Sequence, residues 1–506
     1  MKRAKSIMVM GTMSSSGKSF VTAGLCRIFH QDGFRTAPFK SQNMALNSYI
    51  TKDGYEMGRA QVMQAEAAGI APDVRMNPIL LKPTSECGSQ VIVNGEVLDT
   101  MRATEYYRRK QEMIPQIVRA YDSLAAENDI IVLEGAGSPA EINLKSVDIV
   151  NMGMANLSDS PVILVGDIDR GGVFASLYGT VALLEPEERR RIQGIVINKF
   201  RGDVSILESG LRMLENLTGI PVLGVLPYAP IDLDEEDSLA ERLTQHGKKQ
   251  GAALDIAVIR LPHISNFTDF DVFDSVEAVS LRYVTHPAEL GTPDWVILPG
   301  TKSTMADLRW MRQNGMEAKL LKLHEKGCLI TGVCGGFQML GKTISDPHQA
   351  EGGGSMRGIG LLAMDTVFST QKQRRQIQGQ VCQLPESLHA LSGAAAAGYE
   401  IHMGQSTSQG VDVPLLRLDN GETDGLCTKD GQVFGTYLHG VFDAPEFLQP
   451  ILQMLLQKNG NAEITAQPVD RAAYKEAQYN RLAELLREHL DIPKIYDILN
   501  QWGSTS

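Results

Sequence analysis

The first half of the chain repeats one pattern, in which a short apolar segment is followed by a glycine-containing turn and an amphipathic helical segment. The apolar segments are 7–10, 36–39, 130–134, 162–165, 195–197 and 222–225. Strands that alternate with helices form a parallel sheet with helices on both faces. The same rhythm restarts with apolar segments at 255–259, 295–298 and 328–331. The pattern therefore predicts two α/β domains, the first built on a doubly wound parallel sheet.

A change of composition separates these two stretches. Residues 230–253 contain a proline, an acidic run at 232–237 and a segment with lysines and glycines, which is typical of a linker. The alternative is a long surface excursion within one domain. Residues 462–502 alternate apolar and charged side chains at helical spacing. We therefore expect four parts: 1–229, a linker at 230–253, a second domain at 254–450, and a helical extension at 451–506.

The overall composition excludes several classes of function. A net charge of -12 disfavours non-specific binding to nucleic acid or to an anionic membrane surface. With 43% hydrophobic and 21% charged residues, the chain resembles an ordinary globular enzyme rather than a disordered protein. No apolar run approaches the length of a membrane span, and none resembles a signal peptide. We expect a cytoplasmic protein with no nucleic-acid or membrane partner.

A glycine- and serine-rich loop at 11–19 follows the first apolar segment and precedes a helical one. Such a loop directs backbone N–H groups at an anion, and the helix dipole adds positive potential. Lys18 is then expected to neutralise the β- and γ-phosphates of a bound nucleotide, and Ser19 to offer its hydroxyl to magnesium. The strict phosphate-loop pattern has glycine where this chain has Thr12. The residues expected to bind the nucleotide are Gly11, Thr12, Ser14, Ser16, Gly17, Lys18 and Ser19.

Residues 328–341 predict a buried strand, a tight turn that carries Cys334, and the start of a helix. Glycines at 332, 335 and 336 are expected to allow the backbone angles of a strained elbow. Such an elbow exposes the thiol at a helix N-terminus, which favours the thiolate. The sequence therefore predicts a cysteine nucleophile, of a kind also found in proteases and other hydrolases.

A nucleophilic cysteine needs a base and an oxyanion site. His439 follows an apolar segment and is flanked by glycine, so we predict that it pairs with Cys334; the alternative is a structural histidine. The backbone N–H of Gly335, just after the cysteine, is a candidate oxyanion donor, and Gly300 is a candidate for the second. The sequence thus predicts a Cys–His pair assembled from distant parts of the chain.

The loop at 11–19 resembles that of dethiobiotin synthetase and of its relatives, the amidating enzymes of cobalamin synthesis. The segments 132–137, 37–40 and 196–200 resemble further motifs of that group. The resemblance implies that Glu134 contacts magnesium, that Lys40 faces the phosphates and that Asn198 contacts adenine. It also places the strands of Glu134 and Asn198 side by side. The alternatives are an acidic helix cap for Glu134 and a solvated surface lysine for Lys40.

The segments around Cys334, His439 and Gly300 resemble a class I, triad-type glutamine amidotransferase domain. Ordinary members carry an acid two residues after the histidine, and this chain has Val441 there. The resemblance to the cobalamin-pathway branch implies a glutaminase that works with cysteine and histidine alone. Glu400 is the candidate for a third residue, with a structural or interdomain contact as its alternative.

Four more segments, 39–48, 77–83, 148–155 and 167–175, extend the resemblance to the cobalamin-pathway amidotransferases over nearly the whole chain. The resemblance implies ATP- and glutamine-dependent amidation of four carboxylates (b, d, e and g) of adenosylcobyrinic acid a,c-diamide. ATP, Mg²⁺, L-glutamine and the corrinoid are the expected ligands, and a homo-oligomer is left open. Asp148 is expected either to place the corrinoid carboxylate or magnesium, or to cap a helix.

Two rival functions remain at this point. One is amidation of the a and c carboxylates by the same chemistry. The other is a non-enzymatic nucleotide switch that carries a glutaminase-like binding module.

Overall fold

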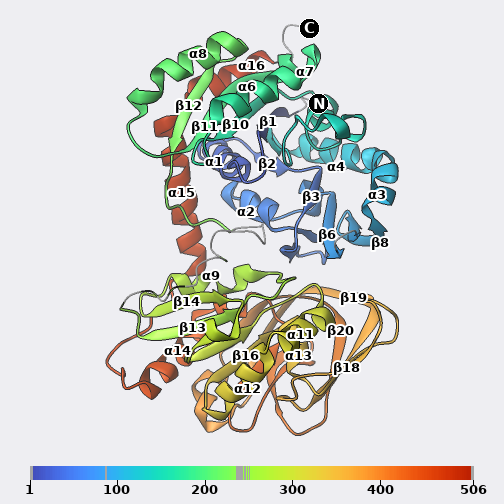
Figure 1. The fold of residues 1–506 in the computed structure, drawn as a ribbon, viewed down its shortest axis with the longest axis vertical. Helices are drawn as coiled ribbons and strands as arrows, with labels where there is room; N and C mark the ends of the chain where they lie inside the picture. Colours follow the sequence, from blue (N-terminus) through green and yellow to red (C-terminus); the bar gives the residue numbers. More distant parts are fainter. Residues whose placement is uncertain are drawn as a thin grey trace. The chain divides into compact units, whose positions relative to one another are not determined.

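The computed structural model describes residues 4–85, 88–234, 243, 247, 249 and 251–502. The chain divides into two compact units (Figure 1). Each unit is built from segments that are not contiguous in the sequence. Unit 1 comprises Met1–Ala45, Glu56–Asp234 and Tyr474–Ser506, and unit 2 comprises Leu46–Tyr55 and Glu235–Ala473. This division differs from the expected boundaries, because 46–55 belongs to unit 2 and the C-terminal extension is divided between the units. Most of the expected linker, at 235–242, 244–246, 248 and 250, lies outside the described residues.

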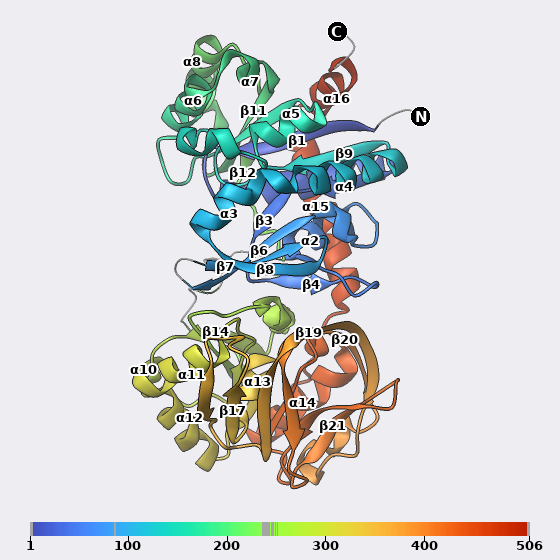
Figure 2. The same ribbon diagram turned by 90° about the vertical axis from the view of Figure 1, so that its right-hand side faces the viewer.

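A six-stranded parallel sheet forms the centre of unit 1 (Figure 2). Its strands, in spatial order, are β12 (Val222–Pro227), β11 (Ile192–Phe200), β10 (Val162–Asp167), β1 (Lys5–Gly11), β9 (Ile130–Glu134) and β2 (Thr36–Phe39). Each contains one of the six apolar segments predicted from the sequence. The expectation that the strands of Glu134 and Asn198 are neighbours is wrong, because β1 and β10 lie between β9 and β11.

Helices and a second, smaller sheet complete unit 1. The smaller sheet has the order β3 (Gln42–Met44), β6 (Ile79–Ser85), β7 (Gly88–Val93) and β8 (Glu96–Arg102), and a further short strand is β5 (Glu56–Gly58). The helices are α1 (Lys18–Gln31), α2 (Arg59–Ala67), α3 (Ala103–Arg109), α4 (Ile114–Glu127), α5 (Met152–Ser158), α6 (Val173–Leu183), α7 (Pro186–Arg191), α8 (Glu208–Thr218), α16 (Ile492–Gln501) and most of α15 (Arg471–His489).

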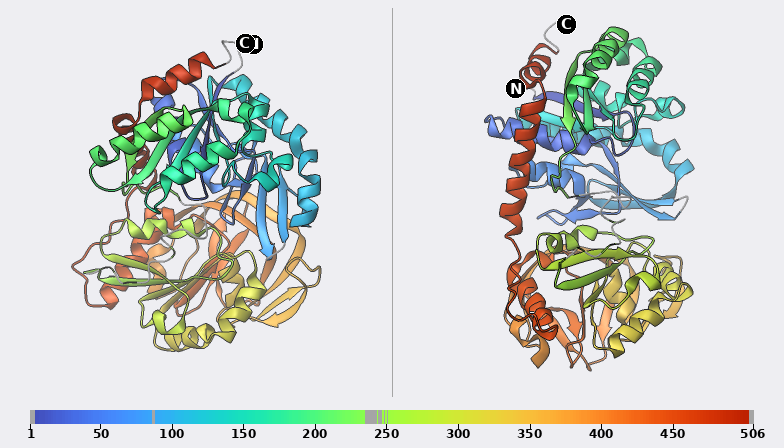
Figure 3. Two further views of the ribbon diagram at one scale, coloured as in Figure 1. Left: turned by 45° about the horizontal axis from the view of Figure 1, so that its top comes forward. Right: turned by 60° about the vertical axis from the view of Figure 1, so that its left-hand side comes forward.

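The end of the chain is part of the core of unit 1. Apolar side chains of α15 and α16, among them Leu482, Leu486 and Ile495, are buried together with those of α1 and the central strands. The contact with α1 is close, since a Cβ atom on Gly24 would lie 2.3 Å from a methyl carbon of Leu486. Figure 3 shows α15 as a long helix at the red end of the colour scale. The last part of the predicted helical extension, from Tyr474 onward, therefore completes the core of unit 1.

Unit 2 is built on an eleven-stranded mixed sheet. The strands on its main path are β14 (Val279–Val284), β13 (Leu254–Ile259), β15 (Trp295–Leu298), β16 (Leu329–Val333), β23 (Val433–Thr436), β22 (Thr423–Cys427), β21 (Val413–Leu418), β19 (Met364–Val381), β17 (Thr343–Asp346) and β18 (Gly354–Arg357), and β20 (Ala395–Ser408) pairs with β19. The first five are parallel to one another. The strand β4 (Ser48–Ile50) also belongs to this unit.

The helices of unit 2 connect the parallel strands and follow the last of them. They are α9 (Asp271–Asp274), α10 (Pro287–Leu290), α11 (Thr304–Gln313), α12 (Met316–Glu325), α13 (Gly335–Leu340) and α14 (Pro445–Lys458). Within the part of the chain that the structure describes, we find no helix whose length and apolar character would allow it to cross a membrane.

Candidate active sites

Cys334 occupies a sharp turn between β16 and α13. Its backbone has φ 52° and ψ -109°, a positive-φ conformation that is rare for a residue with a side chain. The glycines at 332, 335 and 336 do not have positive φ angles, so they do not supply the strained conformation that the sequence suggested. They are needed for space: a Cβ on Gly336 would lie 2.1 Å from the Leu298 carbonyl oxygen, and one on Gly332 would lie 2.6 Å from the Phe337 nitrogen.

The elbow packs more deeply than expected, since the Cys334 residue is only 7% exposed. Its Sγ atom lies 3.6 Å from the Ile401 carbonyl oxygen, and its side chain is close enough to His439 to raise the pKa of that imidazole. The structure therefore brings together the two residues that the sequence proposed as nucleophile and base.

His439 has an acidic partner that the sequence did not reveal. Its Nδ1 atom lies 2.7 Å from an oxygen of Asp269, whose other oxygen accepts the Gly440 N–H at 3.0 Å. Burial lowers the pKa of His439, but the Asp269 carboxylate and Cys334 together raise it to about 10. The arrangement is a buried Cys–His–Asp triad, in which the imidazole holds a proton at neutral pH.

The topology explains why these residues meet. Asp269, Gly300, Cys334 and His439 follow β13, β15, β16 and β23, which are adjacent parallel strands. Side chains that follow the carboxyl ends of parallel strands gather at one edge of the sheet. Asp269 could not be selected from the sequence because it lies ten residues beyond its strand, in the short helical turn Phe267–Phe270, among several other acids.

The two expected oxyanion donors lie beside the elbow. Gly335 begins α13, so its N–H has no acceptor within that helix. A Cβ on Gly335 would lie 2.6 Å from the Thr301 side chain, and one on Gly300 would lie 3.1 Å from the Cε1 atom of His439. The 300–301 segment thus runs between the nucleophile turn and the imidazole.

Glu400 has other partners. Its carboxylate pairs with Arg375 and lies 3.4 Å from the Nε2 atom of His402. Within the described residues we find no hydrogen bond between Glu400 and His439, whose Nδ1 faces Asp269. This geometry matches the structural alternative considered for Glu400, while Asp269 occupies the orienting position.

The loop at 11–19 in unit 1 has the features of an anion cradle. Gly17 has φ +98°, and a Cβ there would lie 1.9 Å from the Asn198 side-chain nitrogen, so only glycine fits. The hydroxyls of Thr12 and Ser16 are buried without a hydrogen-bond partner in the described structure. Buried polar atoms are nearly always satisfied, so these two are suited to a bound polar ligand.

Lys18 lies within the loop and is nearly buried. Its Nζ atom donates to the Met13 carbonyl at 2.8 Å and to the Gly137 carbonyl at 3.2 Å. Burial lowers the pKa of Lys18 to about 8, even though the Glu134 carboxylate favours its charged form. An added anion such as a phosphate would stabilise this ammonium.

Glu134, at the end of β9, is the centre of a buried polar cluster. One of its oxygens accepts hydrogen bonds from Ser19 at 2.9 Å and from Lys40 at 2.8 Å, and the other accepts one from Gln64. Burial would raise the pKa of Glu134, but the charge and hydrogen bond of Lys40 lead a set of contacts that hold it below its ordinary value. Gln64, on α2, is a partner that the sequence did not indicate.

This cluster fits a magnesium ion bound with a nucleotide. Magnesium usually takes one or two protein oxygens and completes its shell with phosphate oxygens and water. The Ser19 hydroxyl and the Glu134 carboxylate, 2.9 Å apart, are such a pair. Among the described residues there is no group of three or more His, Cys, Asp or Glu side chains that could hold a metal without a nucleotide.

Asn198 lies beside the phosphate cradle, and Asp148 lies in a turn before α5. The Asn198 amide donates to the Ser16 carbonyl at 3.0 Å and so supports the loop. The Asp148 carboxylate accepts the backbone N–H groups of Val150, Asn151 and Gly153 at 2.8–2.9 Å. This is the capping geometry that was one of the two expected roles for Asp148.

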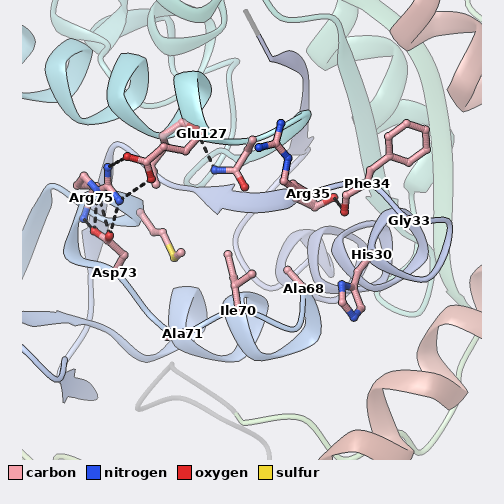
Figure 4. A pocket seen from close by; sticks show the side chains of 14 residues that line it. His30, Gly33, Phe34, Arg35, Ala68, Ile70, Ala71, Asp73, Arg75 and Glu127 are labelled. Carbon is pink, nitrogen blue, oxygen red and sulfur yellow. Dashed lines mark hydrogen bonds and ion pairs between the residues drawn. The ribbon is translucent and has the colours of Figure 1, made fainter.

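A cavity of about 530 Å³ in unit 1 lies away from these residues. It opens near Thr36 at the start of β2, whereas Lys40 follows the end of that strand. Figure 4 shows that Arg75, one of its charged side chains, is already held by Asp73 and Glu127. None of the candidate site residues lines this cavity.

Comparison with known protein families identifies two domains in the chain. Residues 7–239 match the model of the CobQ/CobB/MinD/ParA nucleotide binding domain, and residues 255–447 match that of the CobB/CobQ-like glutamine amidotransferase domain. The fold and the sites thus define a nucleotide-binding α/β domain joined to a glutamine amidotransferase.

Full-length relatives make the assignment more specific. Proteins named cobyric acid synthase from Ruminiclostridium cellulolyticum, Lachnoclostridium phytofermentans and Citrobacter koseri are 54%, 53% and 52% identical to this chain. Each alignment covers 98% of this chain and 98–99% of the relative. The chain belongs to the cobyric acid synthase family, and it is a glutamine-dependent, ATP-using amidoligase.

Proposed function

We propose that this protein amidates the b, d, e and g carboxylates of adenosylcobyrinic acid a,c-diamide, using ATP and glutamine, and so forms adenosylcobyric acid. The observation that carries the proposal is the buried Cys334–His439–Asp269 arrangement in a chain that also holds a phosphate cradle. The full-length relatives are named cobyric acid synthase, which supports the corrinoid product of this proposal.

The glutaminase step uses the residues of unit 2. Cys334 attacks the side-chain amide carbon of glutamine, and His439 gives its proton to the leaving nitrogen. The raised pKa of His439 suits this role, because the imidazole carries the proton before the bond breaks. Backbone N–H groups of Gly335 and Gly300 stabilise the oxyanion, and water then hydrolyses the thioester.

The ligase step uses the residues of unit 1. A carboxylate is a poor electrophile for ammonia, so ATP first converts it into an acyl phosphate. Lys18 and Lys40 balance the phosphate charge, and Gly11, Thr12, Ser14, Ser16 and Gly17 surround the phosphates. Ser19 and Glu134 are positioned to hold Mg²⁺, which would neutralise charge on the phosphates. Asn198 contacts adenine, and Asp148 fixes the turn at 148–153 through its three N–H contacts.

The remaining assignments concern the setting of the reaction. We place the protein in the cytoplasm, where ATP is available and thiols stay reduced. The five described cysteines are free, which agrees with such an environment. Corrinoid, ATP and glutamine are the proposed partners, with assembly into a homo-oligomer left as a further option.

Product analysis tests the proposal directly. The protein is incubated with ATP, Mg²⁺, glutamine and the a,c-diamide, and the corrinoid mass is followed. We expect four amidations of this substrate and none of unamidated cobyrinic acid. Two amidations of the unamidated compound would instead establish the a,c-diamide synthase.

Two variants separate the half-reactions. Cys334→Ala should abolish glutamine hydrolysis but retain amidation driven by added ammonia. Lys18→Met should abolish amidation with either nitrogen source. A nucleotide switch with an inactive glutaminase module would show no amidation in the wild type and no glutamine hydrolysis to lose.

A further inference from the structure

The strand that pairs with the catalytic histidine carries a tyrosine that no step above uses. Tyr399 and His439 form an antiparallel bridge, with N–H to carbonyl distances of 3.2 and 2.8 Å. Their rings stack at a centroid distance of 5.3 Å and an angle of 22°. Gly398 permits this approach, since a Cβ there would lie 1.9 Å from the His439 carbonyl oxygen. Tyr399 therefore contacts His439 through both backbone and ring.

The hydroxyl of Tyr399 is fixed by a closed set of three hydrogen bonds. It donates to the Ser48 carbonyl at 3.0 Å and accepts from the Asn266 amide at 3.1 Å, while Asn266 accepts the Ser48 N–H at 3.3 Å. Each of these three residues is at most 5% exposed. In a buried setting, loss of one member leaves the others unsatisfied, so the set is expected to be rigid.

The residues around Tyr399 are also connected to Asp269 and to Cys334. Asn266, in a left-handed conformation with φ 53°, begins the turn that carries Asp269. Ile401, two residues after Tyr399, supplies the carbonyl that faces the Cys334 thiol. Ile50 packs against both Tyr399 and Ile401. Segment 46–55, which comes from the N-terminal part of the sequence, thus packs against the strand that flanks the catalytic pair.

We infer that Tyr399 is a positioning residue for His439, and that segment 46–55 is a working part of the glutaminase because it holds Tyr399 in place. The ring supports the face of the imidazole, and the hydroxyl anchors the ring to Ser48 and Asn266. This inference rests on the proposed glutaminase role of unit 2. It adds that a segment distant in sequence sets the rate of ammonia formation.

Substitutions in the full-length protein test the inference, with glutamine hydrolysis as the readout. Tyr399→Phe keeps the ring and removes only the anchoring hydroxyl. We expect kcat to fall about tenfold, with little change in KM for glutamine, because a misplaced catalytic group slows the chemical step. Tyr399→Leu also removes the ring, so kcat should fall further. The alkaline limb of its pH profile should also move to lower pH, since an aromatic face stabilises a cation.

A double-variant cycle tests whether the residues act as one network. Asn266→Gly removes the amide but keeps a residue that tolerates a left-handed backbone. If the network is shared, Asn266→Gly combined with Tyr399→Phe should lower kcat no further than the more damaging single change. Tyr283→Phe, which alters a buried tyrosine on β14, is the matched control and should leave kcat unchanged.

The outcomes are separable from those of the proposed function. Ammonia-driven amidation should stay at the wild-type rate in every variant, which shows that the chain is folded. The inference is overturned if Tyr399→Phe retains wild-type kcat, if its effect appears only in KM, or if the effects of Tyr399→Phe and Asn266→Gly simply multiply. If the wild type itself does not hydrolyse glutamine, the proposed function fails first.

Discussion

At the scale of single residues, the acid that holds His439 is the clearest difference between expectation and structure. The family resemblance implied a cysteine and a histidine acting alone, and Glu400 was the candidate for a third member. The structure instead places Asp269 against Nδ1. An acid from the helical turn at Phe267–Phe270 thus lies where the acid two positions after the histidine is expected in ordinary members.

Replacing Asp269 with asparagine should therefore impair the glutaminase strongly. The change removes the carboxylate that raises the pKa of His439. We expect kcat to fall by up to about 10⁴-fold, the loss that the same change causes in a Ser–His–Asp triad. The alkaline limb of the pH profile should move to lower pH, because the imidazole loses its proton more easily. Steady-state glutamine hydrolysis between about pH 6 and 10 measures both effects.

Glu400→Gln provides the matched control for this change. It neutralises an acid of the same unit that faces Arg375 and His402 rather than His439. We expect its kcat to stay within a few-fold of the wild type and its pH profile to keep its position. Equal losses in the two variants would contradict the assignment of Asp269.

The buried ion pair between Lys40 and Glu134 gives a second prediction at this scale. Lys40→Met leaves the Glu134 carboxylate buried with less compensation, and breaking such a pair typically lowers the free energy of unfolding by about 3–5 kcal/mol. The folded-state pKa of Glu134 lies below its ordinary value of 4.5. Its contribution to stability is therefore present above that pH and lost as the pH falls through the folded-state pKa. The destabilisation should be largest near neutral pH and should fade in acid.

Denaturant unfolding at a series of pH values measures this effect. Arg35→Met serves as the control. Arg35 directly precedes β2, the strand that Lys40 follows, and forms an exposed ion pair with Asp129. An exposed pair contributes little, so its unfolding midpoint should hardly change. The role given to the pair would be contradicted if Lys40→Met lowered the free energy of unfolding by the same amount at pH 4 and at pH 8.

At the scale of secondary-structure elements, the contact between α1 and α15 can be tested through two helical glycines. A Cβ on Gly24 in α1 would lie 2.3 Å from Leu486 of α15, whereas one on Gly179 in α6 would meet nothing within 4 Å. Gly24→Ala should destabilise unit 1 by about 1–3 kcal/mol through overpacking. Gly179→Ala should stabilise it by about 0.4–1 kcal/mol through reduced freedom of the unfolded chain. Thermal unfolding of both variants should show shifts of opposite sign.

The comparison of elements also shows what the sequence can predict. The six strands of the central sheet of unit 1 were predictable because strands buried on both faces are continuous apolar runs. The smaller sheet was missed, since β3 has only three residues and β8 is largely exposed. Nothing local distinguishes such strands from loops.

The residues of the candidate sites also fall into those that the sequence could predict and those that it could not. Cys334, Lys18 and Ser19 lie in local motifs where glycine marks a turn, so they could be selected from the sequence as candidate site residues. Asp269, Gln64 and Tyr399 act through partners at least 40 residues away along the chain, and their own sequence surroundings carry no signal. The order of strands also depends on tertiary packing, which is why the predicted neighbourhood of Glu134 and Asn198 was wrong.

At the scale of the whole molecule, the interleaving of the two units predicts how fragments behave. Unit 1 needs Tyr474–Ser506 to cover the apolar face of α1. Unit 2 needs Leu46–Tyr55, which packs against Tyr399 and Ile401 of β20. Residues 1–234 or 251–506 expressed alone should therefore aggregate, because each lacks a buried segment of its own unit. Expressed together, they should co-purify and hydrolyse glutamine. An active, monomeric 251–506 fragment would contradict this prediction.

The return of α15 and α16 to unit 1 also has a consequence during translation. About 240 residues separate Asp234 from Tyr474, so the ribosome must finish unit 2 before the last helices of unit 1 emerge. At about 5–20 residues per second, this delay lasts roughly 12–50 seconds. Throughout it, the nascent first unit presents the apolar surface of α1 that those helices later cover. We therefore expect synthesis in the cell to depend on chaperones that bind nascent chains.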